Sequence, residues 1–109
     1  MLIRLSPANN VPPRAFENVI SHTATSFDCH AVIVYVKTDV REIRFYLAAD
    51  AVSKTPATFE QHKQVIATLL LIDSGAEIVT PKHTYSGWAD FSAKTFDSLP
   101  GELNDISTT

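Results

Sequence analysis

Two runs of strand-forming residues, separated by a very short gap, constrain the fold of this chain more than any other feature. Cys29 to Lys37 reads C-H-A-V-I-V-Y-V-K, and Arg41 to Ala49 reads R-E-I-R-F-Y-L-A-A. β-Branched and aromatic residues in such density are typical of strands. The gap at Thr38-Asp39 leaves room only for a tight turn, so the two runs are predicted to pair as an antiparallel hairpin.

The spacing across this turn predicts that Val34 pairs with Ile43 and that Val32 pairs with Phe45. Alternate residues of a strand point to opposite faces of the sheet, so the pairing divides the hairpin into two sets. The predicted core face carries Val32, Val34, Val36, Ile43, Phe45 and Leu47. The predicted outer face carries Ala31, Ile33, Tyr35, Glu42, Arg44 and Tyr46.

Two amphipathic helices are predicted to flank the hairpin. The first runs from Pro13 to Ser26, with a cap at Asn10 or Val11, because its apolar residues recur at spacings of three and four. These residues are Phe16, Val19, Ile20, Thr23 and Phe27. The second begins at Thr55 as the cap with Pro56 at its first position, and Gly75 ends it after Ser74. Its apolar arc contains Phe59, Val65, Ile66, Leu69, Leu70 and Ile72.

Short apolar segments at Leu2 to Leu5 and Ala76 to Thr80 complete the pattern as strands. The order strand, helix, strand, strand, helix, strand is that of the ferredoxin-like split βαβ fold. This α+β fold has a four-stranded antiparallel sheet of order 4-1-3-2 with both helices on one face. We expect Ser92 to cap a further short helix that ends at Pro100-Gly101, a single domain over residues 1–101, and a polar, mobile tail over residues 102–109.

Composition excludes several classes of function. The chain has three glycines, no two within ten residues of each other, and so lacks the clustered glycines of phosphate-binding loops. One cysteine excludes an internal disulfide, and no zinc-type ligand pair is present, so we predict neither metal nor cofactor. A net charge of −3 without a basic run argues against nucleic acid. The absence of a long apolar stretch or secretory pattern predicts a cytoplasmic protein that does not enter a membrane.

The expected topology brings most of the titratable side chains of interest to one edge of the sheet. This edge cluster comprises His22, Cys29, His30, Asp50 and His83. His62 belongs to the same edge but lies within the apolar arc of the second helix, where a depressed pKa would suit a general base. A buried, hydrogen-bonded structural histidine is the competing interpretation of His62, and a small buried hydrophobe is that of Cys29.

The outer face of the sheet is the stronger indication of function, because an exposed face is expected to be polar. A cluster of apolar and aromatic residues there predicts a partner. The candidate residues are Ile33, Tyr35, Arg44, Tyr46 and Trp88. We expect a homodimer or a protein partner on this face. Single-stranded nucleic acid is a weaker alternative, and a third is that residues 85–99 fold back over the face and bury it within the chain.

Phe59 to His62 reads F-E-Q-H, which, with the chain length and element order, resembles the dimeric α+β barrel group. The resemblance implies a cavity between two sheets and oxidation or isomerisation of a small apolar molecule. In such an enzyme His62 would be the acid–base candidate, and Tyr35, Tyr46 and Trp88 would line the pocket. The enzyme differs from a binding module in one respect, because the enzyme needs a titratable group, such as His62, that faces a closed cavity.

Overall fold

A computed structural model of the chain describes residues 1–8, 11–81 and 83–93. It is a small α+β domain in which one antiparallel sheet has the strand order β2-β3-β1-β4-β5. The elements are β1 (Ile3–Ser6), α1 (Pro13–Ser26), β2 (His30–Lys37), β3 (Glu42–Ala48), α2 (Phe59–Ile72), β4 (Glu77–Val79), β5 (Thr84–Ser86) and α3 (Gly87–Ala93).

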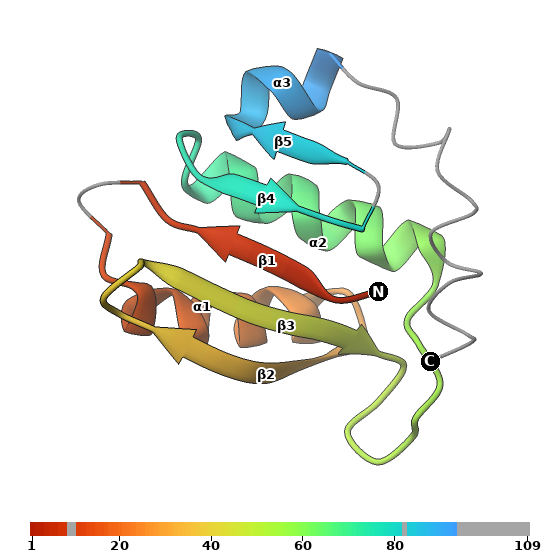
Figure 1. Cartoon of the computed structure of the whole chain (residues 1–109). Helices are drawn as coiled ribbons and strands as arrows, with labels where there is room; N and C mark the ends of the chain where they lie inside the picture. Colours follow the sequence, from red (N-terminus) through yellow and green to blue (C-terminus); the bar gives the residue numbers. More distant parts are fainter. Residues whose placement is uncertain (9–10, 82, 94–109) are drawn as a thin grey trace.

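The helices of the described residues leave one face of the sheet bare. Figure 1 shows α1 and α2 behind the same face, whereas α3 lies beyond β5 at the edge of the sheet. The first four strands follow the expected neighbour order, but the four-strand expectation is wrong because β5 adds an edge strand beside β4. None of the helices in the described ranges is long and apolar enough to span a membrane.

The core lies between the two long helices and the sheet. On α1 the predicted stripe is confirmed, since Phe16, Ile20 and Thr23 are buried. The sheet contributes its alternate residues from β1, β3, β4 and β5, all of them fully buried or nearly so. They are Ile3, Leu5, Ile43, Phe45, Leu47, Ile78 and Tyr85.

The predicted register of the hairpin is wrong for two reasons. The turn spans residues 38–41, so Ile43 pairs with Val36 rather than with Val34, and β2 contains a β-bulge. Ile33 pairs with Phe45 and Tyr35 pairs with Arg44, so Val34 is an extra residue without a partner on β3. A bulge inserts one residue into the alternation and so reverses the facing of all residues on one side of it. Ala31 and Ile33 therefore pack toward the core, whereas Val34 is 51% exposed.

The second helix begins three residues later than expected. Its cap is Thr58, which accepts a hydrogen bond from the backbone N–H of Gln61, while the Gln61 side chain accepts one from the backbone N–H of Thr58. This reciprocal capping box satisfies two donors that Thr55 could satisfy only in part. Pro56 instead forms a bridge with Ala48. The helix also ends earlier than expected, at Ile72 rather than at Ser74. The side chain of Ile72 is 55% exposed and is not part of the core arc.

The segment after β4 differs most from expectation. Residues 84–93 form β5 and α3 at the sheet edge, so this part of the segment does not fold back over the bare face. Ser92 lies near the end of α3 rather than at a helix start, where its hydroxyl donates to the carbonyl of Ala89. The expected helix end at Pro100-Gly101 and the tail over residues 102–109 both lie outside the described residues.

Gly87 has a structural role that the sequence did not indicate. Gly87 has φ of +87°, and a Cβ there would lie 2.4 Å from the carbonyl oxygen of Ser74. That same oxygen accepts a hydrogen bond from the N–H of Trp88. Gly75, expected as a helix stop, is not among the residues with positive φ, and the helix cap is Asp73. The lack of a side chain at Gly87 thus lets the start of α3 approach the backbone that follows α2.

The bulge can be tested with two charged substitutions at adjacent positions. Ile33→Lys should lower the free energy of unfolding by about 2 kcal/mol or more, because it places a charge against the core. Val34→Lys should change it by no more than about 0.5 kcal/mol, because that side chain reaches solvent. Urea unfolding of both variants measures the difference, and the opposite ranking would restore the unbulged register.

The role of Gly87 predicts a second contrast. Gly87→Ala should lower the free energy of unfolding by about 1–3 kcal/mol, because it combines a strained φ with a clash at the Ser74 carbonyl. Gly75→Ala is the matched control, since its nearest contact would be the Cβ of Ala8 at 3.3 Å. Equal stability of the two variants in thermal and urea unfolding would contradict the assignment.

Candidate interaction face of the sheet

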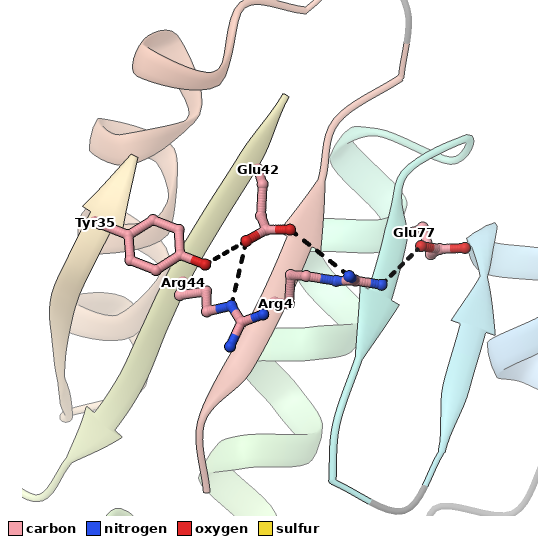
Figure 2. A network of polar contacts seen from close by, with 5 residues as sticks. All are labelled: Arg4, Tyr35, Glu42, Arg44 and Glu77. Carbon is pink, nitrogen blue, oxygen red and sulfur yellow. Dashed lines mark hydrogen bonds and ion pairs between the residues drawn. The ribbon is translucent and has the colours of Figure 1, made fainter. Parts of the chain in front are cut away.

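A polar network crosses four strands of the bare face (Figure 2). Glu42 on β3 lies at its centre, and its Oε2 accepts hydrogen bonds from the Tyr35 hydroxyl and from Nε of Arg44, the latter at 3.2 Å. Its Oε1 lies 3.6 Å from a guanidinium nitrogen of Arg4 on β1. The other terminal nitrogen of Arg4 lies 3.5 Å from Glu77 on β4. One carboxylate thus connects an aromatic ring and two cations from three strands.

The network changes the titration of two of its members. The hydrogen bond from Tyr35 lowers the pKa of Glu42, and the hydrogen bond and nearby charge of Arg44 lower it further. Donation to the same carboxylate raises the pKa of the Tyr35 hydroxyl. Glu42 therefore stabilises the fold above its unfolded pKa, and this contribution is lost as the pH falls through its lowered folded pKa. Since the groups face solvent, the network mainly fixes side-chain positions and adds little stability.

Apolar side chains occupy the other half of the face, toward the start of β1. Leu2 is 43% exposed and Tyr46 is 41% exposed, while Val32 is partly covered. Val32 pairs with Tyr46 across β2 and β3. The face is therefore divided into a charged half, centred on Glu42, and an apolar half, centred on Tyr46.

A hollow of about 880 Å³ lies in the apolar half, where the connection from β3 to α2 curls beside the sheet. Leu2, Val32 and Tyr46 line it from the sheet, and Pro56 and Pro81 line it from two loops. Three titratable side chains also line the hollow, namely His30, Asp50 and Lys54. Leu2, Arg4, Arg44 and Val79 line a smaller hollow of about 320 Å³ nearer the charged half.

The predicted edge cluster is divided among several surroundings. His30 and Asp50 line the larger hollow together, and backbone N–H groups of Ser53 and Val52 lower the pKa of Asp50, with a smaller contribution from His30. His83 stacks against Tyr85, with 6.1 Å between ring centroids.

The other two members of the edge cluster lie apart from the hollow. His22 is exposed on α1. Cys29 is buried and donates from Sγ to the carbonyl of Ala24 at 3.4 Å, and burial raises its pKa. Within the described residues no group of three or more histidine, cysteine or acidic side chains is placed to hold a metal ion.

His62 lies in the core of the domain. It is 0% exposed, and its Nδ1 lies 2.9 Å from the carbonyl oxygen of Thr58 one turn earlier in α2. It lines neither of the two hollows on the bare face. This surrounding matches the structural interpretation of a histidine within an apolar arc.

The five residues predicted for the outer face do not stay together. Tyr35, Arg44 and Tyr46 lie on the bare face, whereas the bulge turns Ile33 toward the core. Trp88 lies on α3 beyond β5, with its ring 5.9 Å from that of Phe91, and strands β4, β1 and β3 separate β5 from β2. Trp88 therefore belongs to the packing of α3 rather than to the surface around Tyr46.

Sequence reasoning missed the two side chains that link the charged half together. Arg4 and Glu77 lie on neighbouring strands and pair across them, and their charges interrupt apolar alternation in short segments. The single charged residue within each of the apolar segments Leu2 to Leu5 and Ala76 to Thr80 could have indicated an exposed side of these strands. The loop residue Lys54, which was also missed, carries no comparable pattern.

Comparison of the chain with models of protein families, with curated proteins and with solved structures finds no match.

Removing the central charge of the network should lower the pKa of Tyr35. Glu42→Gln abolishes the negative charge that disfavours the phenolate, while Arg44 and Arg4 still favour it, so the hydroxyl should titrate at lower pH. The ¹³C shift of the Tyr35 Cζ during alkaline titration measures this change. Glu77→Gln is the control, because it leaves the hydrogen bond between Tyr35 and Glu42 in place. An unchanged Tyr35 pKa in Glu42→Gln would contradict the network.

Proposed function

We propose that this protein is a small non-enzymatic binding module that acts as a homodimer through the bare face of its sheet. The observation that carries the proposal is a sheet face uncovered by any described helix, with Leu2 and Tyr46 each more than 40% exposed on it. Exposed apolar side chains that gather on one face are typical of interaction sites. Aromatic and arginine side chains, here Tyr46 and Arg44, are enriched at the centres of such interfaces.

Charge balance supports a second copy as the partner. The whole chain has a net charge of −3, which would make two copies repel each other at long range. On the charged half of the face, however, Arg4 and Arg44 balance Glu42 and Glu77. A face that is locally neutral and carries both signs can meet its own copy about a two-fold axis without excess like charge. The alternative form of the proposal is that the same face binds a different protein with a similar apolar surface.

The burial of His62 supports a binding module over the enzyme that the resemblance implied, because that enzyme needs the residue at a cavity. The fold that we propose is a ferredoxin-like one extended by β5 and α3. The buried thiol of Cys29 suits a reducing compartment, so we propose a cytoplasmic location.

Substitution of the apolar half tests the dimer. Light scattering of the unmodified protein should give twice the chain mass of 12.0 kDa at high concentration. A double variant, Leu2→Ser with Tyr46→Ser, should weaken self-association at least about tenfold, because two exposed apolar anchors are lost.

The matched control replaces two exposed apolar residues on α2, which are Leu71 (61% exposed) and Ile72 (55% exposed). Leu71→Ser with Ile72→Ser should leave the mass unchanged. If the sheet variant has the same mass as the unmodified protein at every concentration, the homodimer on this face is excluded. A monomeric unmodified protein would exclude it equally.

A further inference from the structure

The larger hollow on the bare face has the size and lining of a small-molecule site. Its volume of about 880 Å³ lies within the range of about 300–1,000 Å³ that is usual for ligand pockets. Apolar groups make up most of its lining, and they come from separate parts of the chain. Tyr46 and Val32 line it from the sheet, and Pro56 and Pro81 line it from two loops.

Two donors at this hollow lack a hydrogen-bond partner within the described part of the chain, although the charge of His30 contributes to the lowered pKa of Asp50. Among the described residues neither the ring of His30 nor the ammonium of Lys54 forms a hydrogen bond or an ion pair. The third titratable group, Asp50, already has hydrogen-bond partners in the loop. Its Oδ1 accepts hydrogen bonds from the backbone N–H groups of Val52 at 2.9 Å and Ser53 at 2.6 Å.

The role of Asp50 is therefore to fix the loop that carries Lys54, because its carboxylate turns toward the loop backbone. A ligand that enters the hollow meets a mostly apolar lining and two donors, the ring of His30 and the ammonium of Lys54. A carboxylate complements this arrangement, because hydrogen bonds from charged donors to a carboxylate are about twice as strong as neutral ones. A flat apolar body complements the exposed face of the Tyr46 ring, on which aromatic groups stack.

We propose that this hollow binds a small aromatic carboxylate. Lys54 and His30 hold its carboxylate group, and its ring lies on Tyr46 between Pro56 and Pro81. The site shares Leu2 and Tyr46 with the proposed dimer face, but Lys54 and His30 belong to the site alone. Lys54→Met therefore tests ligand binding separately from dimerisation.

The test uses 2-naphthoate as the probe and 2-naphthylmethanol as an uncharged probe with the same ring system. Titration of the ¹⁵N-labelled protein with 2-naphthoate should give saturable shifts of the Val32 and Tyr46 amide signals. The alcohol should bind at least about tenfold more weakly, because it lacks the charge that Lys54 recognises. Absence of saturation, shifts confined to other surfaces, or equal affinity for both probes would overturn the proposal.

Two variants separate the charged contact from the apolar one. Lys54→Met keeps the length of an exposed side chain and should weaken 2-naphthoate about tenfold without affecting the alcohol. Tyr46→Ser should weaken both probes. Arg14→Gln, an exposed cation on α1, is the matched control and should bind both probes like the unmodified protein. An equal loss of 2-naphthoate affinity in Arg14→Gln and Lys54→Met would show a general charge effect and overturn the site.

Discussion

The bulge at Val34 determines what each face of this sheet presents. One extra residue in β2 places Ile33 in the core opposite Phe45 and lets Tyr35 share a side with Arg44 and Glu42. Without it, Tyr35 could not remain beside Glu42 while Ile33 stayed buried, because strand residues alternate strictly. The core and the charged half of the bare face therefore depend on the same local insertion. The cost of the missing ladder pair is offset by the burial of Ile33 and by the hydrogen bond of the Tyr35 hydroxyl.

The parts of the fold that follow from periodicity were accessible from sequence. The stripe from Phe16 to Thr23 predicted α1 with correct bounds, and the two β-branched runs predicted β2 and β3. The bulge could not be predicted, because an unbroken run such as A-V-I-V-Y-V is apolar on both sides of the strand. Such a run does not show which of its residues face the core. The start of α2 depended on a choice between two threonine caps, and only the reciprocal contact of Thr58 with Gln61 decides it. β5 was missed because Thr84 to Ser86 is too short for a detectable alternation.

The sequence predicted a site on the outer face of the sheet, but it identified only some of the residues that form it. Arg44 and Tyr46 could be placed on one face because the alternation of β3 is regular, and the facing of Tyr35 was predicted correctly because it lies between the bulge and the turn. His30 and Asp50 could be placed together because topology sets which strand ends meet. The lining from Lys54, Pro56 and Pro81 could not, since it depends on the path of loops. Trp88 was assigned to the face from its aromatic character alone, and the packing of α3 against α2 overrides that assignment.

The position of β2 has a consequence for how the protein avoids unwanted association. β2 is an edge strand and is eight residues long, so its outer backbone groups could template a strand from another chain. A bulge near its middle interrupts the regular row of donors and acceptors, and the exposed Lys37 adds charge at its end. Both are devices that blunt sheet edges against open-ended aggregation. Edge-to-edge growth along β2 is thereby disfavoured.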